Sequence, residues 1–181
     1  MRIPSNMFKA GEYVARHLEP HEGGELDDEQ IQPNGVDLKI DKVLKHSGKA
    51  HLTDGEYKKP ARSEAAKISA DSLAADIADT IDSDWVYNLK AGGYVIVYDE
   101  KITEIPEGHI GIVFPRSRVL RTSGHVNTAV WDSGYSGRGE GGLMLTQPTF
   151  LDPDMKIAQM TFARASHTTD YNGSHQGERT E

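Results

Sequence analysis

The feature that most constrains the fold is a series of short apolar segments that begins at Trp85. The segments WVYNL, YVIVYDE and IGIVF are separated by Gly92-Gly93 and by Pro106-Glu107-Gly108, and apolar runs at 128–131, 143–145 and 157–162 follow. Turn signals that recur about every 8 to 12 residues are typical of β-sandwiches and barrels. We therefore expect an all-β domain built from many short strands.

The segments before Trp85 are expected to add a strand and some helix. Val36, Leu38 and Ile40 alternate with polar residues, as in a strand. Residues 6–17 place apolar side chains at mixed spacings of three, four and seven, which predicts a short helix. Residues 53–84 form an insertion with apolar residues at roughly helical intervals, and two interpretations stay open for it: a peripheral helix or a mobile charged loop.

The length of 181 residues is enough for one domain with a core. We expect this domain to span residues 1–169. The last residues, 170–181, contain two glycines and almost no apolar side chain, so they predict a flexible tail.

Charge and composition exclude several functions. The net charge is −8, so the surface as a whole disfavours nucleic acid and anionic membranes as partners, and a bound phosphate requires a local basic pocket. The chain has no Cys, which excludes disulfides, a thiolate nucleophile and the zinc site of the usual zinc deaminases. No run is apolar enough for a membrane span or a signal peptide, so we expect a cytoplasmic protein.

The first candidate site is PRSRVLR, residues 115–121, at the end of an apolar segment. It places Arg116, Ser117, Arg118 and Arg121 close together in an otherwise acidic chain. Guanidinium groups match phosphate oxygens in geometry and a hydroxyl adds a neutral donor, so the segment predicts a polyphosphate site. The alternative is a solvated basic strand end.

The second candidate is the segment from Asn127 to Gly137, read as a strand that runs into a glycine-rich turn. Its backbone can face the edge of a planar ligand, and Asp132 can hold or deprotonate a water. An ordinary β-hairpin with a turn Asp is the alternative. Asp37, which enters a strand after a turn, and the tail segment Gly173-Ser174-His175-Gln176-Gly177 are weaker candidates.

The order of these elements carries a family resemblance. The segments NGVDL, PRS with Arg121, AVWDSGY and KIAQM, followed by a glycine-rich tail, resemble the motifs of the dUTPase and dCTP deaminase superfamily over residues 30–177, apart from the insertion. WDSGYSGRGE is similar to the archaeal branch of dUTPases, and YNGSHQG to the deaminases' tail. The resemblance implies a distorted jelly-roll β-barrel and a homotrimer with active sites at the subunit interfaces.

The resemblance also implies roles for individual residues. Arg116, Ser117 and Arg121 would bind the triphosphate, and Asp132 would position the attacking water and act as general base. Backbone groups of Asn127, Thr128, Ala129 and Val130 would read the uracil edge. Tyr135 would lie against the deoxyribose and reject ribonucleotides.

The same resemblance implies a lid over the active site and a bound metal ion. Gln159, Tyr171 and Gln176 would close over the phosphates. Mg²⁺ would be chelated mainly by the three phosphates, and Asp37 would reach it at most through a water.

The resemblance leaves two reactions open, and we favour hydrolysis of dUTP to dUMP and pyrophosphate. dCTP deamination, alone or combined with dUTP hydrolysis, needs a Glu at the position that Gly142 occupies, and Glu140 lies two residues earlier. The deaminases' His-Arg pair before the motif Asp is here Val130-Trp131. A non-catalytic nucleotide-binding protein on the same fold is the third hypothesis, against which Asp132, Tyr135, Ser117 and Arg116 argue.

Overall fold

The computed structural model of the chain describes residues 7–53, 57–58, 60–166 and 169–178. Within these residues the main sheet has nine strands, all paired antiparallel. Its order is β10 (His109–Pro115), β14 (Lys156–Arg164), β3 (Gly35–Ser47), β9 (Gly92–Ile102), β12 (Gly137–Leu145) and β11 (Gly124–Asn127). The short strands β1 (Leu18–Glu19), β2 (Ile31–Gln32) and β6 (Ala61–Glu64) pair with the long ones.

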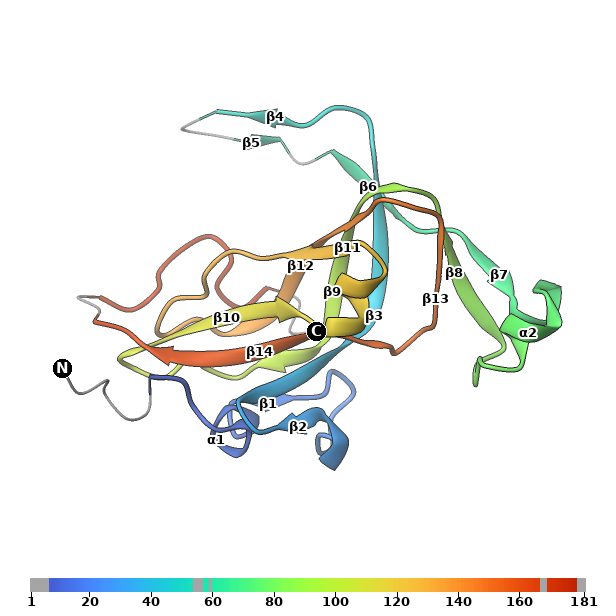
Figure 1. Cartoon of the computed structure of the whole chain (residues 1–181). Helices are drawn as coiled ribbons and strands as arrows, with labels where there is room; N and C mark the ends of the chain where they lie inside the picture. Colours follow the sequence, from blue (N-terminus) through green and yellow to red (C-terminus); the bar gives the residue numbers. More distant parts are fainter. Residues whose placement is uncertain (1–6, 54–56, 59, 167–168, 179–181) are drawn as a thin grey trace.

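The long strands curve into a barrel-like arrangement (Figure 1), which confirms the expected all-β class. The two end strands of the path approach each other through the segment that follows β11. There Trp131 and Gly111 exchange two backbone hydrogen bonds of 2.8 and 3.0 Å. The strand expected over residues 128–131 is thus reduced to one bridge, because Ala129 and Val130 are exposed and line a pocket.

The core fills the inside of this sheet with side chains that alternate along the strands. In β9, Tyr94, Ile96 and Tyr98 are buried, as the apolar pattern predicts. The largest fully buried side chains are Tyr87, Tyr98, Phe162, Leu38, Ile40, Leu89, Ile96, Ile102, Ile105, Leu143, Ile157 and Met160. Burial of this apolar surface is the main stabilising contribution.

In its described residues the insertion, 53–84, holds three short strands and two short helical segments joined by loops, and no long helix. Strand β6 pairs with the end of β3, and β7 (Lys67–Ser69) joins β8 (Trp85–Leu89) and β13 (Thr149–Leu151) in a separate sheet. Helical structure is limited to η2 (Ala70–Ser72) and α2 (Ala75–Ala78), while β4 (His51–Leu52) pairs with β5 (Tyr57–Lys58). The pairing of β6 with β3 and of β7 with β8 satisfies the backbone hydrogen-bonding groups of these segments. The helical intervals of the apolar residues do not outweigh this pairing.

The N-terminal helix is shorter than predicted. Helix α1 spans Gly11–Ala15, whereas Phe8 forms an antiparallel bridge with Ala163 of β14. Gly11 allows the close approach of the helix to the barrel, because a Cβ there would lie 1.9 Å from the carbonyl oxygen of Gln32. Residue 6 lies outside the described residues. Two other short helices are η1 (Asp28–Gln30) and α3 (Ser117–Arg121).

No helix in the described part of the chain is long and apolar enough to cross a membrane.

Candidate functional site

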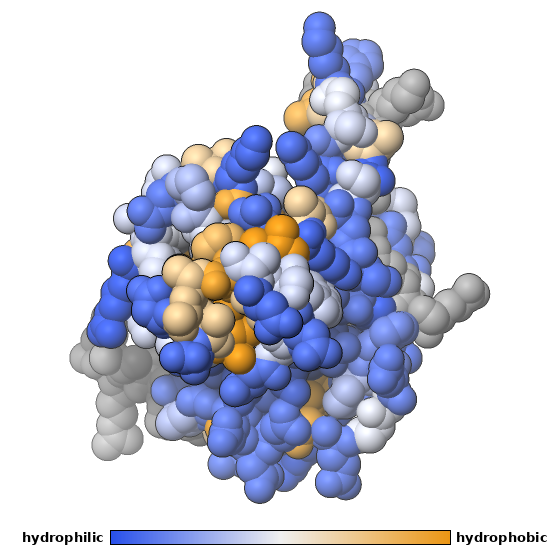
Figure 2. Space-filling model, turned by 90° about the vertical axis from the view of Figure 1, so that its right-hand side faces the viewer, coloured by the Kyte–Doolittle hydropathy of each residue, from blue (hydrophilic) through white to orange (hydrophobic). Residues whose placement is uncertain are grey.

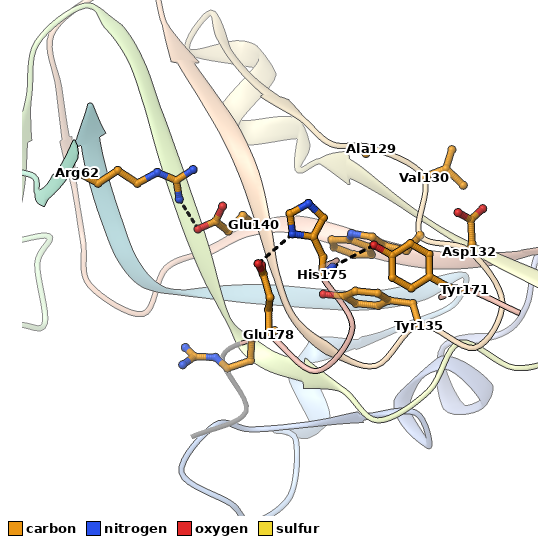
Figure 3. Close-up of a pocket in the computed structure, with 11 residues that line it drawn as sticks. Arg62, Ala129, Val130, Asp132, Tyr135, Glu140, Tyr171, His175 and Glu178 are labelled. Carbon is orange, nitrogen blue, oxygen red and sulfur yellow. Dashed lines mark hydrogen bonds and ion pairs between the residues drawn. The ribbon is translucent and has the colours of Figure 1, made fainter. Parts of the chain in front are cut away.

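A pocket of about 410 Å³ lies between the start of β12, the loop after β11 and the tail (Figure 3). It is lined by Arg62, Ala129, Val130, Trp131, Asp132, Tyr135, Arg138, Glu140, Tyr171, His175 and Glu178. The pocket therefore combines two predicted segments that are distant in sequence, the turn after β11 and the tail. Its size suits a small organic ligand.

Aromatic rings form one wall of the pocket. Trp131 and Tyr135 are stacked, with ring centroids 6.3 Å apart and planes only 8° from parallel. Tyr171 meets Tyr135 edge to face at 5.5 Å. Flat apolar surfaces of this kind suit a planar base or a sugar ring.

The turn that carries Asp132 is fixed from both sides. The amide of Gly134, which has φ +80°, donates to the carbonyl oxygen of Ile105 at 2.8 Å, and the hydroxyl of Ser133 donates to the carbonyl oxygen of His109 at 2.6 Å. Asp132 itself is exposed and lines the pocket. A carboxylate on a rigid turn that water can reach is suited to hold a water in a defined position.

The described tail, residues 169–178, is hydrogen-bonded to this turn and to the start of β12. The amide of Tyr171 donates to the carbonyl oxygen of Ser133 at 2.7 Å, and the side chain of Gln176 donates to the carbonyl oxygen of Gly134 at 2.9 Å. Tyr171 lines the pocket. Gln176 is hydrogen-bonded to the turn but does not line the pocket. His175 pairs with Glu178 at 2.9 Å, and both line the pocket.

The end of the pocket opposite Asp132 is charged. Arg62 from β6 lies 2.6 Å from Glu140 of β12. The register of β12 against β9 shifts between Arg138 and Glu140. Sequence reasoning missed Arg62, because no local signal shows that this part of the insertion pairs with β3. It also missed Arg138, which is buried and bonded to Asp41 at 2.6 Å.

A smaller pocket of about 280 Å³ adjoins the first. Asn127, Thr128 and Ala129 line it together with Glu140, and it also includes Val95, Gly141 and Gly142. Ala129 and Glu140 line both pockets. Of the four residues expected to read a base edge, the structure thus places three at the small pocket and two, Ala129 and Val130, at the large one.

The remaining predicted residues form a different group. Arg116 Nε lies 3.2 Å from Oδ2 of Asp37, and Gln159 is the strand partner of Asp37. Ser117 and Arg121 begin and end α3, so the basic segment is a short helix where we expected a strand end. Among the described residues, none of these five lines either of the two pockets above.

Asp37 is only 2% exposed. Burial raises the pKa of its carboxyl group, and this effect exceeds the opposite effects of Arg116, Lys156 and Arg118. No cluster of three or more His, Cys, Asp or Glu side chains placed to hold a metal occurs in the described residues. A buried carboxyl group beside a guanidinium does not fit a direct metal ligand, so these side chains alone do not form a metal site.

The family follows from a comparison of the sequence. The profile of the dCTP deaminase-like family matches residues 11–165. The chain belongs to this family. The match spans the whole barrel, including the turn with Asp132, and it confirms the resemblance read from the motifs.

Proteins with similar sequences include archaeal ones. The chain is 38% identical over 176 residues to a "Probable deoxyuridine 5'-triphosphate nucleotidohydrolase" of Halobacterium salinarum, and the match covers 97% of both chains. A protein of the same name from Aeropyrum pernix is 33% identical over 153 residues, which cover 82% of this chain and 86% of that one.

A solved structure agrees with the barrel of the dCTP deaminase-like family. The 2'-deoxycytidine 5'-triphosphate deaminase from Agrobacterium tumefaciens superposes with a TM-score of 0.61 at 14% identity, over 87% of this chain. This chain spans 48% of that deaminase. The similarity confirms the fold class.

Proposed function

We propose that this chain hydrolyses dUTP to dUMP and pyrophosphate. The observation that carries the proposal is that Asp132 and Tyr135 line one pocket of suitable size, with Asp132 exposed on a rigid turn. The names of the archaeal relatives in the dCTP deaminase-like family support the same substrate.

In the proposed mechanism Asp132 orients a water in line with a phosphorus of the substrate. The water oxygen attacks, the bond to the bridging oxygen breaks, pyrophosphate leaves, and Asp132 accepts the proton. Tyr135 lies against the deoxyribose and leaves no room for a 2′-hydroxyl. The backbone of residues 127–130 reads the base, and Tyr171 and Gln176 keep the tail over the reacting groups.

The phosphate-binding groups would come from a neighbouring subunit. Arg116, Ser117 and Arg121 do not line the pocket that contains Asp132, so a complete site of the proposed kind needs a second copy of the chain. We propose a homotrimer with shared sites, in which Gln159 also approaches the phosphates.

A surface feature supports the proposed assembly. An apolar patch is visible on one face of an otherwise mostly hydrophilic surface (Figure 2). Contiguous exposed apolar surface of this kind is typical of interaction sites.

We propose that Mg²⁺ accompanies the substrate, bound mainly by the three phosphates. Three phosphate groups supply the oxygen ligands that this ion prefers. Asp37 would contribute at most through a water. We also propose that the protein works in the cytoplasm, where nucleotides are synthesised.

Deamination of dCTP, alone or together with dUTP hydrolysis, is the second candidate. Glu140 favours it, because this carboxylate follows a shift in the register of β12 and lines the same pocket as Asp132. Gly142, at the position where deaminases have Glu, argues against it.

One assay tests both candidates. The full-length protein is incubated with dUTP or with dCTP and Mg²⁺, and the products are separated by ion-exchange chromatography. We expect dUMP and pyrophosphate from dUTP and no product from dCTP. Release of dUTP or dUMP from dCTP would support the second candidate, and binding without turnover would leave a nucleotide-binding protein.

A further inference from the structure

The Arg62–Glu140 pair lies at the end of the pocket opposite Asp132 (Figure 3). Nη1 of Arg62 donates to Oε1 of Glu140 at 2.6 Å. The two side chains are only 21% and 20% exposed, so the pair is shielded from most of the solvent. A charged hydrogen-bonding group held in such a place is suited to orient a ligand.

The position of the pair relative to Asp132 indicates which part of a nucleotide it meets. In the proposed function Asp132 faces the sugar and the phosphates, and Tyr135 lies between the two ends of the pocket (Figure 3), with its ring stacked on that of Trp131. The base then points towards Arg62 and Glu140. Glu140 also lines the smaller pocket with Asn127 and Thr128, whose backbone is expected to read the base edge.

The chemistry of the guanidinium favours uracil over cytosine. Uracil has a carbonyl oxygen, O4, where cytosine has an amino group. A guanidinium has five N–H donors and no acceptor, so it can bond O4 but meets the cytosine amino group donor to donor. One donor of Arg62 is used by Glu140, and Nε of Arg62 is buried without a hydrogen-bond partner among the described residues.

We propose that Arg62 is a specificity-determining residue that donates a hydrogen bond to O4 of the uracil base, while Glu140 holds its guanidinium in position. The proposal rests on the proposed function, since it assumes a deoxyuridine nucleotide in this pocket. It assigns a role to the insertion, which places β6 beside β3 and thereby brings Arg62 to the site.

Equilibrium binding of three non-hydrolysable triphosphates to the full-length protein tests this role. They are the α,β-imido analogues of dUTP, of dCTP and of the 2-pyrimidinone deoxynucleotide, which carries hydrogen in place of O4. The proteins are the wild type and Arg62→Gln. The control is Lys67→Gln, which removes a charge from the same insertion, because Lys67 contacts Glu64 and Trp85 and does not line the pocket.

We expect Arg62→Gln to weaken binding of the dUTP analogue by about 10-fold to 100-fold, the usual size of a hydrogen bond to a charged group. Binding of the 2-pyrimidinone analogue should hardly change, because it lacks the atom that Arg62 contacts. The preference for the dUTP over the dCTP analogue should fall by a similar factor. Lys67→Gln should behave like the wild type.

Two results would overturn the proposal. Equal weakening of the dUTP and 2-pyrimidinone analogues would mean that Arg62 only fastens β6 to β12. A wild type that prefers the dCTP analogue, with that preference lost in Arg62→Gln, would mean that the pair reads the amino group. If Arg62→Gln does not fold, Arg62→Lys, which keeps a cation beside Glu140, should show the same selective loss for the dUTP analogue.

Hydrolysis of dUTP by the wild type is measured in parallel. Selective loss of binding in Arg62→Gln together with no hydrolysis by the wild type would contradict the proposed function and support the role of Arg62. Hydrolysis of dUTP by the wild type, together with an unchanged preference among the analogues in Arg62→Gln, would support the proposed function and contradict the role of Arg62.

Discussion

Nε of Arg116 lies 3.2 Å from Oδ2 of the buried Asp37, and neither residue lines the pocket that contains Asp132. The residues expected to bind phosphate and the expected general base thus belong to two separate parts of one chain. This separation agrees with the proposed sites that are completed by a neighbouring subunit.

Mixing two inactive variants, Arg116→Ala and Asp132→Asn, should restore activity. If each site takes Asp132 from one subunit and Arg116 from another, random assembly gives about one quarter of the sites without either substitution. The measurement is dUTP turnover after the two variants are unfolded together and refolded. Each variant treated alone is the control, and a mixture as inactive as both controls would contradict shared sites.

Asp132→Asn should lower turnover by about 10² to 10⁴ and leave binding of dUTP nearly unchanged. The amide keeps the shape of the side chain but cannot accept the proton of the attacking water. Steady-state kinetics and binding of a non-hydrolysable dUTP analogue measure the two effects separately. Near-normal turnover would rule out the proposed role of this carboxylate.

Removal of residues 170–181 should impair catalysis far more than folding. The described tail contacts the pocket through Tyr171 and the turn through Gln176, but it contributes little to the core. We expect a large loss in kcat/KM and a change in Tm of only a few degrees. Gln176→Ala, which keeps the tail and removes its side-chain contacts with the turn, should give an intermediate loss of activity.

The free energy of unfolding should fall as the pH rises from about 4.5 to about 7, because of Glu100. This carboxyl group is buried and accepts hydrogen bonds from Gln30 and from the amide of Lys39, and burial raises its pKa to about 7. In this pH range the folded state holds a proton that the unfolded state has released. Stability should therefore fall as pH rises, by about 3 kcal/mol over the whole range.

Urea unfolding at pH 5 and pH 8 measures this effect, at one protein and salt concentration. Glu100→Gln has no proton to lose and should show a smaller difference between the two pH values. An equal difference in the variant and the wild type would assign the pH dependence to other groups.

Gly139→Ala should destabilise the protein by about 1 to 3 kcal/mol. A Cβ at Gly139 would lie 2.5 Å from Cζ2 of Trp131, too close to the ring that forms the pocket wall for either group to stay in place. Gly142→Ala is the matched control, because a Cβ there would come no closer than 3.7 Å, to the carbonyl oxygen of Asn127. Urea unfolding and tryptophan fluorescence of both variants measure the effect, and equal stabilities would contradict it.

The sequence predicted several strands of the domain well because their signal is local. The segments WVYNL, YVIVYDE and IGIVF all lie within strands, since alternation of apolar side chains and flanking turn residues act over a few positions. The insertion was harder, because the partners of β6 and β7 are distant in sequence. Apolar residues occur in the insertion at intervals typical of a helix, but the pairing of β6 and β7 with distant strands overrides this pattern.

The candidate site could be predicted in part. Asp132, Tyr135 and Tyr171 lie at one pocket as the motifs imply, because the turn and the tail meet there. Arg62 and Glu178 carry no motif, and their positions depend on long-range strand pairing and on the path of the tail. No local pattern shows that Arg116 lies outside the pocket of Asp132, although the family resemblance implies sites at subunit interfaces.

Strand β6 joins the sheet only at the outer end of β3, beyond the most deeply buried residues of that strand. Changes in the length or sequence of the insertion can therefore move or replace Arg62 while the barrel interior stays as it is. Substrate preference and thermodynamic stability would then evolve along largely independent routes, with new base selectivity arising from a peripheral segment and the reaction machinery preserved.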